Sequence, residues 1–324
     1  MRDHGGNLDR ARAIYGGADW VDLSTGINPI AYEMPYLSAA ALAALPTRED
    51  VASLEMIAAT AYDTSAEIVA LAGAQAAIQL APRLRPAGRA AVLSPSYNEH
   101  AASLKRQGWG VTEALELDDM SGADIAVVVN PNNPDGRRWT HETLIGLAER
   151  VGFLIVDESF ADPHPELSLV PFIGDLGERI LVMRSFGKFY GLAGLRLGFA
   201  LGGPETIAHL RALAGPWAVN GPAIVAGRAA LSDAAWRAET TTRLNRDAAR
   251  LDALAKKAGW RLVGGTALFR TYDTPDAAAA QGRLARSAIW SRIFPYSATW
   301  MRLGLPGTES AWERMATALT RGVE

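Results

Sequence analysis

Short apolar runs recur between residues 68 and 201, and each is followed by a loop and a stretch of helical composition. The runs cover 68–71, 89–93, 125–129, 153–156, 180–183 and 195–201. Their residues are apolar throughout rather than alternating, which is typical of parallel strands buried on both faces. Between or before them we expect helices at 38–45, 49–62, 76–84, 98–107 and 140–150. The pattern predicts an α/β domain with a mostly parallel sheet covered by helices.

After Gly203 the pattern changes. We expect helices at 204–213, 222–258, 275–289 and after Thr308, with short strands at 260–263, 267–272 and 300–305. This mixture predicts a smaller α+β domain. Residues 1–30 show little periodicity and many turn residues. We therefore predict an N-terminal arm (1–30) that packs with the small domain and the active site, a large domain (31–203) and a small C-terminal domain (204–324).

Composition narrows the class of protein. The chain has 324 residues, of which 49% are hydrophobic and 21% are charged, with a net charge of -3. This balance gives no reason to expect a nucleic acid or an anionic membrane as partner. The absence of cysteine excludes disulfides and thiolate metal sites, and it fits a reducing compartment. No apolar run suggests a signal peptide or a membrane span. We expect a cytoplasmic protein without a metal site.

Four polar or aromatic side chains stand at or just after the predicted strand ends, namely Tyr97, Asn133, Asp157 and Lys188. Parallel sheets bind ligands beyond the carboxyl ends of their strands, so these side chains should share one rim. Each also has an ordinary interpretation, respectively as core aromatic, turn residue, helix cap and solvated surface charge. Together, an aromatic ring, an amide, a carboxylate and an amine indicate a pocket for pyridoxal phosphate.

The stretch 180–201 adds an anion site to this rim. Ser185 and Lys188 lie in a glycine-rich turn, and Arg196 is expected inside the apolar strand 195–201. A guanidinium buried in a strand requires an anion. The loop 72–75, between a strand and a helix, offers free amide groups of the kind that bind phosphate.

Three motifs carry a resemblance to a known family. They are NPNNPDG at 130–136, the strand-end Asp157, and Ser185-x-x-Lys188 followed by GLAGLRLGF with Arg196. Over essentially its whole length the chain resembles the fold-type-I pyridoxal-phosphate enzymes, the aspartate aminotransferase superfamily. The resemblance implies the transferase-like fold of that superfamily, the cofactor pyridoxal 5'-phosphate and a homodimer.

The resemblance also implies residue roles. Lys188 would bind the cofactor covalently, Asp157 would pair with its ring nitrogen, Asn133 would contact the ring oxygen and Tyr97 would stack on the ring. The cofactor phosphate would be held by Ser185, Arg196 and the backbone amides of Gly73, Ala74 and Gln75.

Two positions depart from the family pattern. Phe160 stands where relatives often have a tyrosine that donates to the ring oxygen. Leu45-Pro46-Thr47 lacks the tyrosine that in many relatives reaches the neighbouring subunit's phosphate. Neither contact is therefore expected here.

Within the superfamily the chain resembles the threonine-phosphate decarboxylase branch of cobalamin biosynthesis. The matching segments are HGGNL at 4–8, LSTGINP at 23–29, RSFGKFYGLAGLRLGF at 184–199 and WMRLGLPG at 300–307. This implies a carboxy-lyase that converts O-phospho-L-threonine to (R)-1-aminopropan-2-yl phosphate. The alternative is an aminotransferase of the histidinol-phosphate type. Lys188 argues against a non-catalytic relative, and the lack of a strand followed by G-x-G-x-x-G argues against a dinucleotide enzyme.

The choice of reaction depends on how the anionic groups of a small phosphorylated amino acid are held. The candidate substrate-binding residues are His4, Asn28, Arg292 and Arg302. Arginine suits this role because its planar fork matches carboxylate and phosphate oxygens. Arg302 lies inside an apolar run, where a cation needs an anion, whereas Arg292 could equally be a surface charge.

Overall fold

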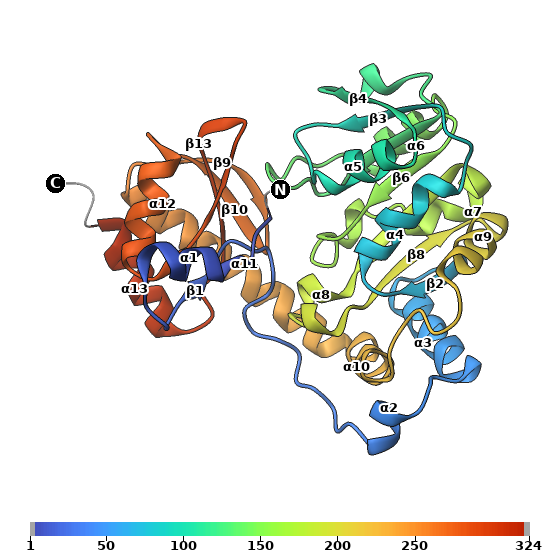
Figure 1. Cartoon of the computed structure of the whole chain (residues 1–324), viewed down its shortest axis with the longest axis horizontal. Helices are drawn as coiled ribbons and strands as arrows, with labels where there is room; N and C mark the ends of the chain where they lie inside the picture. Colours follow the sequence, from blue (N-terminus) through green and yellow to red (C-terminus); the bar gives the residue numbers. More distant parts are fainter. Residues whose placement is uncertain (1–3, 321–324) are drawn as a thin grey trace. The chain divides into compact units, whose positions relative to one another are not determined.

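The computed structural model describes residues 4–320, which form two compact units (Figure 1). The sheet unit contains residues 32–133 and 137–237. The terminal unit contains the chain up to Ala31, the short segment Pro134–Gly136 and the chain from Ala238. This division differs from the boundary predicted at 203/204. Residues 204–237 belong to the sheet unit because α9 (Pro204–Ala214) packs on the sheet and α10 (Gly221–Ser232) packs on a helix of that unit.

The sheet unit is built on seven strands in the order β2-β8-β7-β6-β5-β3-β4. Their bounds are Glu67–Leu71 (β2), Arg89–Leu93 (β3), Gly110–Ala114 (β4), Ile125–Val129 (β5), Leu154–Asp157 (β6), Ile180–Ser185 (β7) and Gly198–Gly202 (β8). Within this sheet β8 runs antiparallel to both of its neighbours, and the other pairs are parallel. The predicted α/β fold with a mostly parallel sheet is confirmed.

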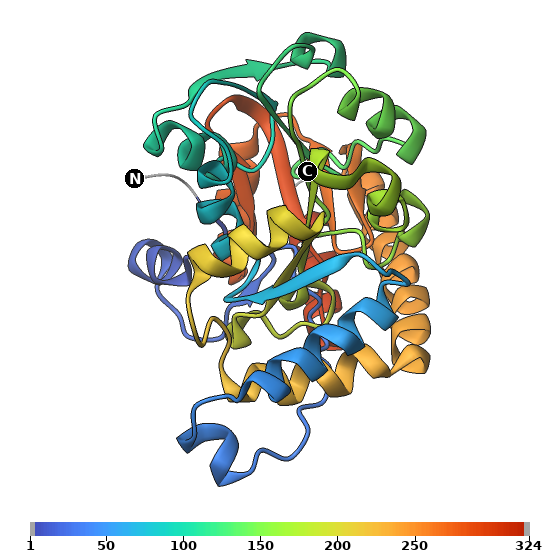
Figure 2. The same cartoon turned by 90° about the vertical axis from the view of Figure 1, so that its right-hand side faces the viewer.

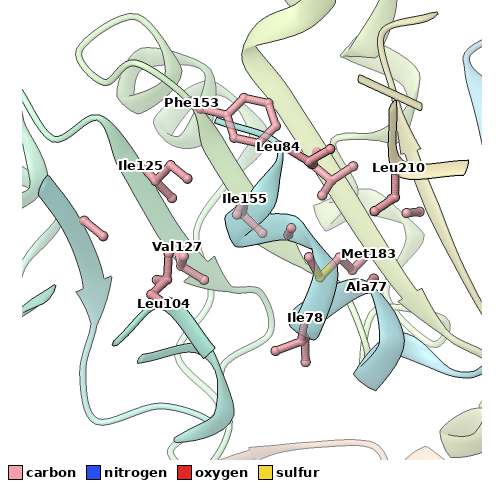
Figure 3. Close-up of a cluster of buried hydrophobic side chains, with 14 of the residues drawn as sticks. Ala77, Ile78, Leu84, Leu104, Ile125, Val127, Phe153, Ile155, Met183 and Leu210 are labelled. Carbon is pink, nitrogen blue, oxygen red and sulfur yellow. The ribbon is translucent and has the colours of Figure 1, made fainter. Parts of the chain in front are cut away.

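The helices of this unit pack on the sheet or on one another. Besides α9 and α10 they are α2 (Ala39–Ala43), α3 (Arg48–Ala61), α4 (Ala74–Leu80), α5 (Glu99–Arg106), α6 (His141–Ala148), α7 (Ile173–Leu176) and α8 (Phe186–Phe189). α3 and α10 run side by side (Figure 2). Figure 3 shows the core on one face, where Val127, Ile155 and Met183 of the central strands meet Ala77 and Ile78 of α4. Burial of this face holds α4, and the loop before it, against the sheet.

The terminal unit combines helices with an antiparallel sheet. The sheet order is β12-β13-β10-β9, with bounds Arg292–Phe294 (β12), Ser297–Gly304 (β13), Phe269–Asp273 (β10) and Arg261–Thr266 (β9). Its other elements are α1 (Leu8–Tyr15), α12 (Ala277–Arg286), α13 (Glu309–Thr320) and the short parallel pair of β1 (Val21–Asp22) with β11 (Ile289–Trp290). α11 (Ala234–Lys257) begins in the sheet unit and continues into this one. The predicted smaller α+β part is confirmed.

Two local expectations were wrong. Arg196 does not lie in a strand, because β8 begins at Gly198 and Arg196 is exposed with a φ of 57°. The helix expected over 222–258 is two helices, since the Asp233 carboxylate caps α11 by accepting from the Trp236 amide. The N-terminal arm, whose sequence shows little periodicity, forms α1 and β1.

Among residues 4–320, no helix combines the length and the apolar content needed to cross a membrane.

Candidate active site

The rim residues of the sheet unit follow adjacent parallel strands. β7, β6, β5 and β3 are neighbours in the sheet, so their carboxyl ends share one edge. Asp157 ends β6 and lies beside Met183 of β7 and Val129 of β5 in the strand register. Lys188 follows β7, Asn133 follows β5 and Tyr97 follows β3. The topology thus gathers the four side chains at one edge of one sheet.

Asp157 is a buried carboxylate, and each of its two oxygens has at least one hydrogen-bond partner. Its exposed fraction is 2%. Its Oδ2 lies 2.9 Å from His100 Nε2, and its Oδ1 accepts from the backbone amide of Ser159 at 3.0 Å and from the Ser159 hydroxyl. Burial alone would raise the pKa of Asp157, but the hydrogen bonds from His100 and Ser159 outweigh it and hold the pKa below its usual range. The carboxylate is therefore ionised at neutral pH despite its burial.

His100 is a site residue that sequence reasoning missed. It lies in the first turn of α5, is buried, and its ring packs edge-on against Tyr97 at a centroid distance of 6.1 Å. The spacing of three residues between Tyr97 and His100 could have indicated that both point to the same edge. Without the Asp157 contact, however, a histidine at this position resembles any buried polar residue.

Replacing His100 with alanine should impair the site at acid pH first. The variant loses the strongest interaction that lowers the Asp157 pKa, so burial will raise that pKa and Asp157 will take up a proton at higher pH than in the wild type. We expect kcat to fall roughly 10- to 100-fold, the loss expected for one hydrogen bond to a charge. The acid limb of the pH–kcat profile should move to higher pH.

His100→Gln is the matched control, because an amide NH2 can still donate to Asp157. It should shift the acid limb less than His100→Ala does. Identical acid limbs in all three proteins would mean that His100 does not control the ionisation of Asp157.

Lys188 belongs to a short helix that is surrounded by stacked aromatic rings. It lies half-buried in the one-turn helix α8, which begins at Phe186 and ends at Phe189, both of them buried. Tyr190 stacks on Phe186 at 4.4 Å, and Trp236 stacks on Tyr190 at 5.6 Å. Close packing of flat rings restricts the backbone that carries Lys188. The Nζ of Lys188 lies 5.7 Å from the ring centroid of Phe160, the residue that departs from the family pattern.

Gly73 and Arg196 meet at the start of α4. Gly73 precedes the helix with a φ of 80°, and a Cβ added to it would lie 2.8 Å from Arg196 Nη2. Glycine adopts this backbone conformation readily, whereas residues with a side chain rarely do. Arg196 is oriented by its own turn, since its Nη1 donates to the Ala193 carbonyl at 3.0 Å. The guanidinium and the first amides of α4, those of Ala74 and Gln75, therefore lie beside each other without Arg196 being buried in a strand.

The remaining predicted residues of the sheet unit lie at the same edge. Tyr97 donates its hydroxyl to Gln75 Oε1 at 3.2 Å, which ties the loop after β3 to the start of α4. Ser185 ends β7 and is half-buried. Asn133 is buried in the loop after β5. The nine residues predicted to hold the cofactor are therefore all carried by strand ends, loops and short helices of this unit.

Two arginines of the terminal unit face each other across a strand pair. Arg292 of β12 and Arg302 of β13 are direct partners in the antiparallel register. Like charges placed directly opposite destabilise a strand pair unless an anion lies between or beside them. Arg302 is only 3% exposed and donates from Nη2 to the Ser24 carbonyl at 2.7 Å. The strand register thus places two arginine side chains opposite each other in the terminal unit.

His4 and Arg292 line one cavity of this unit, whose volume is about 70 Å³. The other lining residues are Gly5, Asn7, Arg10, Ser24, Gln281, Trp290, Ser291 and Ile293. Asn28 is placed differently, because its Oδ1 accepts from Arg243 Nη2 at 2.8 Å and from the Ile30 amide at 3.1 Å. Of the four predicted substrate residues, the cavity brings together His4 and Arg292, and Ser24 connects them to Arg302.

Known proteins share both the sequence and the fold. The family profile for aminotransferase class I and II matches residues 45–319. The chain is 42% identical to the threonine-phosphate decarboxylase of Pseudomonas aeruginosa, over 98% of this chain and 97% of the relative. It is 40% identical to a threonine-phosphate decarboxylase of a Sinorhizobium species, with the same coverage of 98% and 97%. The histidinol-phosphate aminotransferase of Sinorhizobium meliloti, solved in complex with pyridoxal-5'-phosphate, has a TM-score of 0.83 at 20% identity, covering 97% of this chain and 93% of that chain, which shows the shared fold alone.

Proposed function

The chain belongs to the class I and II aminotransferase family, and from this premise we propose that it is a pyridoxal-phosphate-dependent carboxy-lyase. The reaction is the decarboxylation of O-phospho-L-threonine to (R)-1-aminopropan-2-yl phosphate, as a step of cobalamin biosynthesis. This proposal depends mainly on the similarity to two threonine-phosphate decarboxylases, which extends over nearly the full chain. That similarity favours decarboxylation over transamination of histidinol phosphate.

The residues at the sheet edge fit the cofactor. The space beside Gly73, which a Cβ would fill against Arg196, is bordered by the start of α4 and by a cation, as a phosphate requires. The predicted role of the Gly73 amide is corrected, because this amide donates to the Leu71 carbonyl at 2.7 Å. The amides of Ala74 and Gln75 are therefore the proposed backbone donors to the phosphate.

The ionised, buried Asp157 suits a protonated ring nitrogen, and Lys188 supplies the amine for a covalent link. Tyr97, Asn133 and Ser185 would complete the set. When bound, the cofactor accepts the electron pair that remains on the substrate Cα after the bond to the carboxylate breaks.

The protein's own residues then have distinct tasks. Asp157, kept ionised by His100 and Ser159, holds a positive charge at the ring nitrogen. As the bond from Cα to the carboxylate breaks and CO2 leaves, Lys188 returns a proton from Nζ to Cα. The stacked rings around α8 hold the backbone of Lys188 in place, which restricts the positions that its Nζ can reach.

The terminal unit would hold the substrate's anionic groups. The opposed cations Arg292 and Arg302 and the cavity residue His4 are the proposed ligands. Asn28 is the fourth proposed ligand, and its Oδ1 accepts from Arg243 Nη2 at 2.8 Å.

Incubation with O-phospho-L-threonine should release CO2 at the same rate with or without an added oxo acid. A decarboxylase restores its cofactor in each turnover by protonating Cα, whereas an aminotransferase needs an acceptor for the amino group. The measurement is CO2 release and product amine in parallel reactions, with histidinol phosphate plus 2-oxoglutarate as the comparison. Turnover only when 2-oxoglutarate is present would assign the protein to the aminotransferases.

We also infer a cytoplasmic homodimer. Five large apolar side chains between residues 34 and 56 are exposed, namely Met34, Tyr36, Leu42, Leu45 and Met56. Exposed apolar side chains in such number along one segment favour a surface that a partner covers. The lack of cysteine fits a reducing compartment. A monomeric mass in solution at micromolar concentration would contradict the dimer, and recovery outside the cytosolic fraction would contradict the location.

A further inference from the structure

We propose that Asn220 is a positioning residue for the cofactor phosphate, because its side chain fixes the turn that presents Arg196. The inference rests on the proposed function, in which the guanidinium of Arg196 binds that phosphate. In this role Asn220 acts through the peptide that joins Leu195 to Arg196, and not by contact with the cofactor. It lies outside the set of site residues predicted from the sequence.

The side chain of Asn220 makes two hydrogen bonds with different effects. Its Oδ1 accepts from the Ala223 amide at 2.9 Å, which caps the start of α10. Its Nδ2 donates to the Leu195 carbonyl at 3.0 Å. Because a side-chain amide carries an acceptor and two donors, one residue can connect α10 to the turn that precedes β8.

The backbone of Arg196 needs such a connection. Its φ and ψ are both 57°, in the left-handed region that residues with a side chain rarely adopt. A conformation of this kind persists where its surroundings fix it. The peptide between Leu195 and Arg196 is a planar unit, whose N–H donates to the Ala193 carbonyl at 3.3 Å and whose carbonyl accepts from Asn220. Rotation of this peptide would change the φ of Arg196, so the hydrogen bond from Asn220 opposes that change.

α10 gives Asn220 a fixed position. A Cβ added to Gly221, the first residue of the helix, would lie 2.1 Å from the Ala41 carbonyl oxygen. A Cβ added to Gly227 would lie 2.7 Å from Leu197 Cδ2. The helix is therefore packed closely against α2 and against the end of the turn, and close packing leaves it little freedom to shift.

The same turn lies directly against the loop before α4. A Cβ added to Gly198 would lie 2.4 Å from the Ala74 nitrogen, and one added to Gly73 would lie 2.8 Å from Arg196 Nη2. The guanidinium thus keeps its place beside the start of α4 only while the turn keeps its conformation. Without the hydrogen bond from Asn220 the guanidinium would sample more positions, and phosphate binding would have to restore the order that is lost.

Asn220→Ser separates this role from the capping of α10. Serine is as good a cap as asparagine and keeps an acceptor for the Ala223 amide, but it lacks the amide group that donates to Leu195. We expect the Kd of the apoprotein for pyridoxal 5'-phosphate to rise about 3- to 10-fold, the effect of one hydrogen bond between neutral groups. The Kd for pyridoxal, which has no phosphate, and the melting temperature of the apoprotein should stay nearly unchanged. Absorbance titration of the apoprotein with each compound measures both values of Kd.

Thr140→Ala is the matched control for the loss of a cap. Thr140 begins α6 in the same unit, where its Oγ1 accepts from the Thr143 amide at 3.4 Å. This variant should have a lower melting temperature and unchanged affinity for both compounds. Asn220→Ala removes the cap and the hydrogen bond to Leu195 together, so it should show both effects.

The outcomes separate the inference from the proposed function. Unchanged affinity of Asn220→Ser for pyridoxal 5'-phosphate, or an equal loss of affinity for pyridoxal, would overturn the positioning role. Arg196→Ala should weaken pyridoxal 5'-phosphate more than Asn220→Ser does, and if it has no effect, the proposed phosphate site and this inference both fail. If phosphothreonine is not turned over, yet Asn220→Ser weakens pyridoxal 5'-phosphate alone, the inference stands and the proposed reaction fails.

Discussion

Replacing Lys188 with alanine should reduce decarboxylation by about 1,000-fold or more and abolish the covalent link to the cofactor. The variant lacks both the amine that binds the cofactor covalently and the group that returns a proton to Cα. Loss of the proton transfer alone lowers the rate by about 100- to 10,000-fold. The fold should survive, because Lys188 is half-buried and the aromatic stack that holds α8 does not include it.

Borohydride treatment followed by peptide mass spectrometry measures the link directly, since reduction makes it permanent. Wild type should carry the cofactor mass on the peptide with Lys188, and the variant on no peptide. Lys188→Arg keeps a cation but cannot form the link, so it should be as inactive as alanine. Lys105→Ala, at the end of α5 on an exposed position, should behave like wild type. A variant without Lys188 that still becomes labelled at full yield would exclude this assignment.

The strands of the large sheet could be predicted because their signal is local. A strand buried on both faces needs apolar residues throughout, so 89–93 and 125–129 were found with their observed bounds. β4 was missed for the same reason, since it lies at the sheet edge with most of its residues accessible to solvent. The end of a buried strand also fixes the place of the next polar residue, which is why Asp157 could be recognised.

Features that depend on contacts between distant segments could not be predicted. Arg196 was assigned to a strand because Leu195 and Leu197 flank it, but its left-handed backbone is set by the turn that brings it against Gly73. His100 matters only because β3 and β6 both flank β5, which brings α5 to Asp157. The opposition of Arg292 and Arg302 follows from a strand register that single residues do not reveal.

A buried ion-pair network lies next to two strand ends of the candidate site. Arg184 of β7 donates to Glu158 Oε2 at 2.9 Å and to Asp162 Oδ1 at 2.8 Å, and the three side chains are almost inaccessible to solvent. Glu158 also accepts from the Ser168 hydroxyl at 2.6 Å and from the Leu169 amide at 2.7 Å. Glu158 follows Asp157 directly, and Arg184 precedes Ser185. The network therefore connects two of the strand ends that carry the candidate site.

Arg184→Met should destabilise the protein by about 3–5 kcal/mol, because it leaves two carboxylates buried without their cation. Burial already raises the pKa of Glu158 against the opposing effect of Arg184. Without Arg184 that pKa rises further, so the folded state binds more protons than the unfolded state and stability falls as pH rises. The deficit should be largest at neutral pH and smaller in mildly acidic solution, as measured by urea unfolding of the apoprotein.

Two comparison variants test whether burial causes this effect. Arg150→Met removes an arginine from the exposed pair with Asp118, whose atoms lie 2.7 Å apart, and should cost less than about 1 kcal/mol. Adding Glu158→Gln to Arg184→Met removes one uncompensated charge and should recover part of the stability. If Arg184→Met cost no more than Arg150→Met, or if its deficit grew as the solution became acidic, the pairing of these buried charges would not be what stabilises the strand ends.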